Sequence, residues 1–225
     1  MTHLVHINPL LFEAGDRLTR EEFLELWERM PALKFAELID GVVYLPSPVS
    51  LEHGQKDTLL QCWMTIYASR TGFIDVAANS TWLMEKESAP QPDVALRIRP
   101  EYGGQSRTEG KLGAGAPEFV AEVTRSSRSY DLGPKLALYE RAGVREYLAV
   151  LTEEERLEWR VRRERGFELI HPDWTRVYRS EVFPGLWLDG SAFWNHDIPA
   201  VLATLEKGLQ SSEFAAFLES HPLTP

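Results

Sequence analysis

The chain has 225 residues, of which 44% are hydrophobic, and its formal net charge is -10. This length fits one domain with elaborations, or at most two small domains, and the hydrophobic content is enough for a sizeable core. No apolar run approaches the roughly 20 residues that a membrane-spanning helix needs, and the first residues lack the basic and apolar regions of a signal peptide. We therefore expect a cytoplasmic protein. The acidic net charge argues against a protein that coats nucleic acid, because such coating depends on Lys and Arg side chains that neutralise phosphates.

Cys62 is the only cysteine, so the sequence excludes an internal disulfide and a cysteine-based zinc site. Its neighbours Leu59, Leu60 and Trp63 are apolar, and we expect a buried thiol. The chain has no GxxxxGK[S/T], HExxH or GxSxG motif. P-loop nucleotide hydrolysis, zincin-type proteolysis and serine-hydrolase chemistry therefore have no support in the sequence.

In the first third of the chain, the sequence predicts a helix near residues 18–30, where Thr19 and Glu22 have the spacing of a capping box. Two β-prone runs follow within residues 35–45. They are joined by Asp40-Gly41, which is a strong signal for a hairpin. Ser50 is expected to cap a long helix that extends to about residue 70.

The rest of the chain alternates between predicted strands and helices. Residues 118–123 are apolar on both faces, which is typical of a central strand. A helix over residues 130–142 then leads to a strand over 146–151, and this order implies a right-handed parallel crossover. The other expected elements are strands at 73–78, 81–85 and 93–98, a loop at 101–117, a hairpin of 156–163 with 167–171, and one or two helices within 198–220.

The informative side chains are acids at positions where acids are disfavoured. Glu122 lies inside the run Phe119-Val120-Ala121-Glu122-Val123, where an ionised carboxylate is costly without a cation or hydrogen bonds. Asp93 opens an apolar strand, and Glu37 interrupts the first hairpin strand. Three acids from three strands are able to converge on one hard cation such as Mg²⁺ or Mn²⁺. Lys135, with Tyr139 on the same helical face, would orient or deprotonate the attacking water or stabilise the developing charge.

An ordered set of motifs makes the interpretation more specific. Together they resemble the Uma family, described as putative restriction endonucleases, within the PD-(D/E)XK nuclease superfamily. The resemblance covers roughly residues 20–190. The motifs are Glu37-Leu38-Ile39-Asp40-Gly41, His53-Gly54, Pro92-Asp93-Val94, Val120-Ala121-Glu122-Val123, Tyr130-Asp131-Leu132-Gly133-Pro134-Lys135-Leu136 and Tyr139-Glu140-Arg141-Ala142-Gly143-Val144-Arg145-Glu146-Tyr147.

The resemblance implies an α/β fold with a restriction-endonuclease-like core, in which helices flank a central mixed β-sheet. It implies an N-terminal extension at 1–17, a nuclease domain at 18–190 and a C-terminal helical extension at 191–225. Asp93 and Glu122 would be ligands of Mg²⁺ or Mn²⁺, and Glu37 and Lys135 would complete the catalytic set. One departure is that the lysine expected two residues after Glu122 is Thr124, so Lys135 resembles a displaced lysine.

Structural interpretations compete with each of these roles. Asp93 alone would be explained by a strand-end cap, and Glu37 by a salt bridge in the hairpin. Lys135 would pair weakly with Asp131 one turn earlier on the helix. His53 is expected to be structural. Residues 156–163 form the most basic strip, for which a solvated outer face competes with phosphate contact.

The sequence therefore predicts a metal-dependent endonuclease that hydrolyses DNA phosphodiester bonds, with a homodimer expected by analogy. Two alternatives remain at this point. One is a non-catalytic module that binds metal or a protein partner, and the other is a hydrolase of small phosphodiesters.

Overall fold

A central six-stranded mixed sheet organises the molecule, in a computed structural model that describes residues 11–46, 49–124 and 128–222. The strand order is β11-β10-β9-β8-β5-β3. β8 and β9 are parallel and the other pairs are antiparallel, so the expected parallel pairing of these two strands and the α/β fold class are confirmed. The strands are β3 (Ile74–Ala78), β5 (Val94–Ile98), β8 (Phe119–Thr124), β9 (Glu146–Leu151), β10 (Arg156–Arg163) and β11 (Gly166–Leu169).

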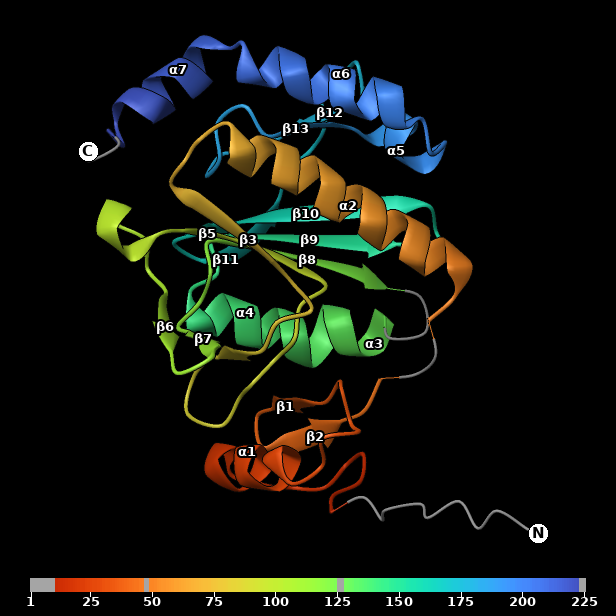
Figure 1. Cartoon of the computed structure of the whole chain (residues 1–225). Helices are drawn as coiled ribbons and strands as arrows, with labels where there is room; N and C mark the ends of the chain where they lie inside the picture. The colour runs from red at the N-terminus through yellow and green to blue at the C-terminus, as the bar shows by residue number, and fades with distance from the viewer. Residues whose placement is uncertain (1–10, 47–48, 125–127, 223–225) are drawn as a thin grey trace, which may run out of the picture.

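Helices cover both faces of this sheet (Figure 1). One face packs against α2 (Leu51–Ser69), and the helices near the C-terminus lie beyond α2 in the figure. The other face is covered by one helical segment that includes Lys135. The elements of these layers are α3 (Arg128–Tyr130), α4 (Leu136–Ala142), α5 (Gly190–Trp194), α6 (Ile198–Leu209), α7 (Ser212–Glu219) and the strand pair β12 (Val177–Arg179) and β13 (Trp187–Asp189).

Alternation along β8 explains why this strand is central. Phe119, Ala121 and Val123 belong to the core beneath α2, whereas Val120 belongs to the core beside α4. Both faces of β8 are therefore buried, as the run of apolar residues predicts. By the same alternation, Glu122 and Thr124 face the α4 side.

A small N-terminal unit lies on the far side of α4 from the sheet (Figure 1). It consists of α1 (Arg20–Glu28) and the hairpin β1 (Glu37–Ile39) and β2 (Val42–Tyr44). The capping box of Thr19 and Glu22 is present. Asp40 has a φ of 49° in the turn, which an Asp side chain tolerates better than most. Both predictions are confirmed, and the hairpin places Glu37 opposite the helical segment.

Three expectations for local structure are wrong. Residues 101–117 are not simply a loop, because β6 (Arg107–Glu109) and β7 (Leu112–Ala114) pair with each other and with β4 (Trp82–Leu83). β4 is itself shorter than predicted. Cys62 is exposed rather than buried, because Leu59, Trp63 and their neighbours one turn away carry the core face of α2. Within the described residues, no helix is both long and apolar enough to cross a membrane.

Candidate active site

Lys135 is the centre of a buried cluster of acidic side chains. Its Nζ lies 2.9 Å from Oε1 of Glu37 and 2.6 Å from Oε1 of Glu122, and only 3% of its side chain is exposed. Asp131, the alternative partner one turn earlier, is more distant at 3.9 Å. The structure therefore brings together three of the predicted site residues, from β1, from β8 and from the helical segment.

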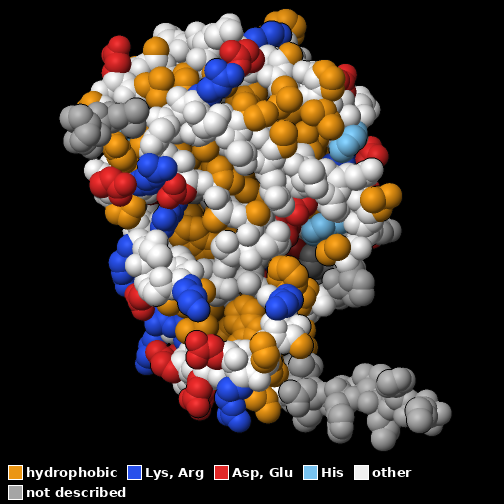
Figure 2. Space-filling view, viewed as in Figure 1, with side chains coloured by type: hydrophobic (Ala, Val, Ile, Leu, Met, Phe, Trp, Pro, Cys, Tyr) orange, Lys and Arg blue, Asp and Glu red, His pale blue; other side chains and the backbone are white. Residues whose placement is uncertain are grey.

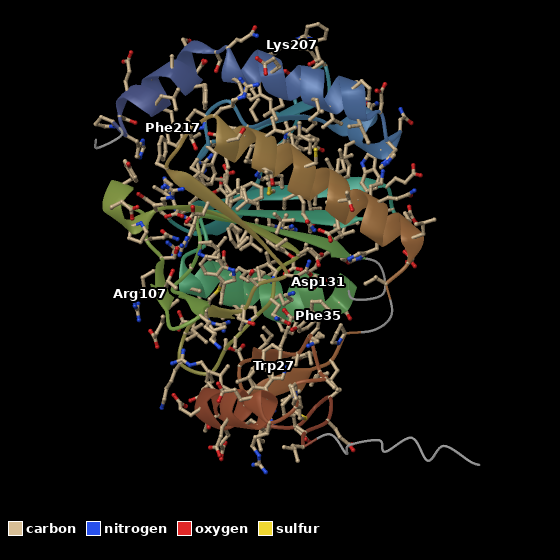
Figure 3. The ribbon with its side chains drawn as sticks, viewed as in Figure 1. Trp27, Phe35, Arg107, Asp131, Lys207 and Phe217 are labelled. Carbon is tan, nitrogen blue, oxygen red and sulfur yellow. The ribbon has the colours of Figure 1, made fainter. Side chains whose placement is uncertain are left out.

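A distortion in the helical segment positions this lysine. Residues Asp131–Lys135 form a π-helical turn that contains Pro134, between α3 and α4. Proline lacks the N–H that an α-helix would use, and single π-turns are frequent at functional sites. Both ends of the turn, Asp131 and Lys135, are buried. Figure 3 labels Asp131 on this segment, between the sheet and the N-terminal unit.

Carboxylates keep the lysine charged. Burial by itself would lower the pKa of Lys135, but Glu122 and Glu37 outweigh it and raise that pKa well above its ordinary value. A protonated ammonium donates hydrogen bonds and carries positive charge. In this arrangement Lys135 fits orientation of water and stabilisation of negative charge better than deprotonation of water.

Glu122 is held by two side chains of the helical segment. Its Oε1 accepts a hydrogen bond of 2.7 Å from the Tyr139 hydroxyl in addition to the ion pair with Lys135. Tyr139 is also part of the core, so both interpretations of this residue hold. Burial raises the pKa of Glu122 well above its ordinary value; Lys135 opposes this shift, and the nearby carboxylate of Asp93 adds to it.

Asp93 lies directly before β5, at the end of the sheet where β5 meets β8. Val94 pairs with Ala121, and continuing this antiparallel register puts Asp93 opposite Glu122. The Val123 N–H donates a 2.7 Å hydrogen bond to Oδ2 of Asp93. Burial raises the pKa of Asp93 to about 6, an effect that this hydrogen bond only partly opposes. Two adjacent carboxylates whose charged forms are destabilised by burial would be stabilised by a cation.

Glu37 is fixed by the residues around it. Its Oε1 accepts a 2.6 Å hydrogen bond from the Gln91 N–H, and its Oε2 accepts one of 3.3 Å from the Tyr130 hydroxyl. Tyr130 stacks on Tyr44 with a centroid distance of 4.0 Å. Glu37 thus has a partner in the helical segment and one in the backbone near Asp93, which couples the hairpin to the site.

Two further residues lie at the site that the sequence does not identify as functional. His53, near the start of α2, has its Nε2 3.9 Å from Oδ1 of Asp93. Asp57 follows one turn later; its carboxylate raises the pKa of Asp93, and its Oδ1 is buried without a hydrogen-bond partner among the described residues. The spacing of His53 and Asp57 on one helix face was the available signal, but nothing in the sequence shows that this face meets Asp93.

The position of the missing lysine is occupied by a buried hydroxyl. Thr124 is 1% exposed, and its Oγ1 has no hydrogen-bond partner within the described part of the chain. It faces the same side of β8 as Glu122. The ammonium that neighbours Glu122 therefore comes from Lys135 in the helical segment.

The available donors fit a magnesium ion that keeps most of its water. The described residues contain no group of three or more His, Cys, Asp or Glu side chains arranged to hold a metal. Asp93 and Glu122 supply two buried carboxylates, and both protein contacts described for Glu122 use Oε1. Magnesium typically takes one or two carboxylates and completes its shell with water and phosphate oxygens. This donor set suits Mg²⁺ or Mn²⁺ better than zinc, which prefers nitrogen and sulfur.

The basic strip on β10 is not part of this cluster. β10 lies between β9 and β11, so it is an internal strand of the sheet and β11 is the edge. Arg156 and Arg160 both pair with Glu158 on the same strand. Their charges are partly neutralised, which weakens the case for phosphate contact. The side chain of Arg160 is only 15% exposed, so the strip is not a solvated outer face along its whole length either.

Comparison with known proteins gives the same fold and a family. Residues 20–191 match the family model Uma2, described as a putative restriction endonuclease. A solved structure described as a putative nuclease belonging to DUF820, from Anabaena variabilis, aligns with a TM-score of 0.63 at 16% sequence identity. The alignment covers 79% of this chain and 98% of that one. No curated protein matches. Because the family model spans most of the sequence, the chain belongs to the Uma2 family.

Proposed function

We propose that this protein is a metal-dependent endonuclease that hydrolyses phosphodiester bonds of DNA. The observation that carries the proposal is the convergence of Glu37, Glu122 and Lys135 at one buried point beside Asp93. Family membership supports a nuclease-like activity. The metal requirement and the choice of DNA are our inference from the carboxylate pair and from that membership.

Asp93 and Glu122 would hold the metal ion. A bound Mg²⁺ or Mn²⁺ supplies Lewis-acid polarisation of the phosphate and a lower pKa of its water. Tyr139 and Lys135 hold Oε1 of Glu122, and the contacts described for this residue leave its other carboxylate oxygen for the metal. Val123 fixes Oδ2 of Asp93 in the same manner through its N–H.

Lys135 and Glu37 would orient rather than exchange protons. The carboxylates of Glu122 and Glu37 raise the pKa of Lys135 and so favour its ammonium form, which places a positive charge beside them. Glu37 holds that ammonium in position with its own hydrogen bonds to Gln91 and Tyr130. A preorganised charge of this kind stabilises negative charge that develops on a phosphate without rearrangement.

The test is cleavage of supercoiled plasmid and of single-stranded DNA with Mg²⁺ or Mn²⁺, for the parent protein and for Asp93→Ala and Glu122→Ala. We expect cleavage by the parent and none by either variant, with the circular dichroism spectrum of Asp93→Ala unchanged. Full activity of Asp93→Ala would disprove the assignment. Mn²⁺ binding without cleavage of any nucleic acid would favour a non-catalytic metal-binding module. The homodimer and the cytoplasmic location stay predictions; light scattering of the purified protein would test the dimer.

A further inference from the structure

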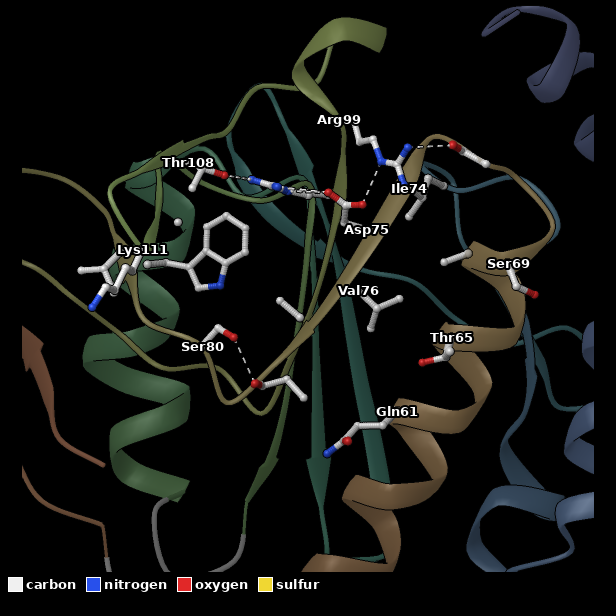
Figure 4. Close-up of a pocket in the computed structure, with 18 residues that line it drawn as sticks. Gln61, Thr65, Ser69, Ile74, Asp75, Val76, Ser80, Arg99, Thr108 and Lys111 are labelled. Atoms are coloured by element: carbon white, nitrogen blue, oxygen red, sulfur yellow. Dashed lines mark hydrogen bonds and ion pairs between the residues drawn. The ribbon is translucent and has the colours of Figure 1, made fainter. Parts of the chain in front are cut away.

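An open groove runs along the free edge of β3, the outermost strand on one side of the six-stranded sheet. Its volume is about 770 Å³. Figure 4 shows the groove between two walls. One wall is α2, with Gln61, Thr65 and Ser69, and the other is the β6–β7 hairpin, with Thr108 and Lys111.

The floor of the groove offers backbone groups that the sheet leaves unused. Two hydrogen bonds show which residues near β3 bond to the partner strand β5. The Arg99 N–H donates to the Phe73 oxygen, and the Asn79 N–H donates to the Asp93 oxygen. In such a ladder, every second residue points its N–H and C=O away from the partner strand. On β3 these residues include Ile74 and Val76, and both line the groove.

A buried tryptophan forms part of the wall. Trp82 lines the groove and is 3% exposed, and its indole Nε1 has no hydrogen-bond partner among the residues described. Its ring packs on Gly113, where a Cβ would lie only 2.3 Å from Cε3 of the indole. The glycine therefore allows the ring to lie flat against β7, and Trp82 has a fixed place in the wall.

The charged side chains of the groove are mostly basic, although the chain carries a net charge of -10. Arg97, Arg99 and Lys111 line it together with a single acid, Asp75. Both arginines pair with Asp75, at 3.0 and 2.9 Å, so one carboxylate serves two guanidinium groups. Lys111 is exposed and takes part in none of the ion pairs found within the described residues. Figure 2 shows Lys and Arg side chains along the left of this face, interspersed with acids.

One end of the groove reaches the candidate active site. Ala78, in its lining, pairs with Val94, and the N–H of Asn79 donates a 3.1 Å hydrogen bond to the backbone oxygen of Asp93. Gln61, one turn after Asp57 on α2, also belongs to the lining of the groove. A chain lying in the groove would therefore be led towards Asp93.

We propose that the β3 groove binds the sugar–phosphate backbone of a nucleic acid strand and leads that strand to Asp93 and Glu122. This proposal rests on the proposed function for the hydrolysis at Asp93 and Glu122. The position of the strand in the groove is a separate claim. Unused strand-edge groups would also suit an extended polypeptide. The excess of basic side chains and the continuity with the acidic site favour a polyanion, whose affinity depends on neutralised phosphates.

Lys111→Ala is the first test, with Lys207→Ala as its matched control. Both are exposed lysines, and Lys207 lies on α6, away from the groove (Figure 3). Fluorescence anisotropy of a labelled oligodeoxynucleotide, single-stranded and as a duplex, is measured over a salt series in a buffer with a chelator. We expect Lys111→Ala to weaken binding and to reduce the slope of log affinity against log salt by about 1, and Lys207→Ala to change neither. The two probes distinguish a single strand from one strand of a duplex as the occupant.

Thr65→Glu tests the opposite wall, with Ala203→Glu on α6 as its control. Each replaces an exposed helical residue by a carboxylate, so each changes the net charge equally. Weaker DNA binding by Thr65→Glu alone would support the groove, and equal effects of the two would overturn it. Unchanged affinity in both groove variants, as expected for a polypeptide occupant, would also overturn it. Binding is measured without metal, so it is tested separately from cleavage. If binding depends on Lys111 but no DNA is cleaved, the proposed function is rejected and the groove proposal stands. If DNA is cleaved but binding does not depend on Lys111, the groove proposal is rejected and the proposed function stands.

Discussion

Nζ of Lys135 lies 2.6 Å from Oε1 of Glu122, although the two residues belong to different elements and are 13 positions apart in the chain. In the superfamily pattern that the sequence resembles, the lysine would follow the acid by two residues on one strand. Here that position is Thr124, and the ammonium arrives from the π-helical turn that precedes α4. The same chemical pair is thus formed across the interface between the sheet and its covering helix.

Removing the charge of Lys135 should destabilise the fold as well as abolish activity. Lys135→Met leaves Glu37 and Glu122 near each other without the ammonium that lies between them. Breaking a buried ion pair by removing one partner costs on the order of 3–5 kcal/mol. We expect a loss of unfolding free energy of that order in urea titrations and no cleavage of plasmid DNA.

The double variant Lys135→Met with Glu122→Gln separates the charge effect from lost packing. If the cost comes from an unpaired carboxylate, neutralising Glu122 should restore part of the stability that the single variant loses, while activity stays absent. Additive losses in the double variant would mean that the two side chains do not interact energetically.

Tyr139→Phe should impair cleavage more than its effect on stability explains. The variant keeps the aromatic ring in the core and removes only the hydroxyl that donates 2.7 Å to Oε1 of Glu122. We expect a stability loss of about 1–3 kcal/mol and slower cleavage, because an orienting hydrogen bond to the metal ligand is lost. Tyr67→Phe is the matched control, since its buried hydroxyl donates to the backbone oxygen of Pro184 in the core beneath α2. A similar stability loss with full activity is expected there; equal loss of activity in both variants would contradict the orienting role.

The sequence predicted the fold well because its signals are local. The capping box of Thr19, the Asp40-Gly41 turn and the apolar run of β8 each specify their own element, and each element formed. The β6–β7 hairpin is not evident in the sequence because each strand has only three residues and β6 is polar. β7 is held by pairing with β4 and by the packing of Trp82 on Gly113. These contacts join residues about 30 positions apart and leave no periodic pattern.

The site was harder to predict because an acid in an apolar strand is not a sufficient signal. Glu118, Glu122 and Glu146 are all buried at the ends or in the middle of central strands. Glu118 accepts hydrogen bonds from the N–H groups of Ile98 and Gln105, which is a structural role. Only the motif order of the family distinguished Glu122 in the sequence, and only the fold shows that Asp57 and His53 approach Asp93.

The stability of the metal-free protein should depend on pH through Asp93. Burial raises the pKa of this carboxyl from 3.8 to about 6, so between these values the folded protein keeps a proton that the unfolded chain releases. The free energy of unfolding contributed by this group is therefore largest below pH 3.8 and is lost as the pH rises through about 6. Asp93→Asn cannot ionise, and we expect its stability, relative to the parent, to increase across this window.

Urea unfolding in the presence of a chelator measures this difference at several pH values. Asp40→Asn is the control, because it removes a half-exposed carboxylate that pairs with Arg141 on the surface. Parallel stability curves for the parent and Asp93→Asn would show that Asp93 titrates alike in the folded and unfolded protein, contrary to the structure.

Glu146→Gln and Glu122→Gln should have opposite effects on metal binding and cleavage. The carboxylate of Glu146 is hydrogen-bonded within the protein, whereas that of Glu122 is placed to hold a cation. Glu146 accepts hydrogen bonds from the N–H groups of Glu181 and Val182 and from the Ser180 hydroxyl. Replacing one accepting oxygen by an amide NH₂ group should cost about 1–3 kcal/mol, because at least one of these donors loses its acceptor. We expect Mn²⁺ binding, measured by calorimetry, and plasmid cleavage to persist in Glu146→Gln at a temperature where it is folded. Glu122→Gln should lose both. If Glu146→Gln abolished metal binding while remaining folded, or if Glu122→Gln retained it, the distinction between a structural and a functional buried acid would be wrong for this protein.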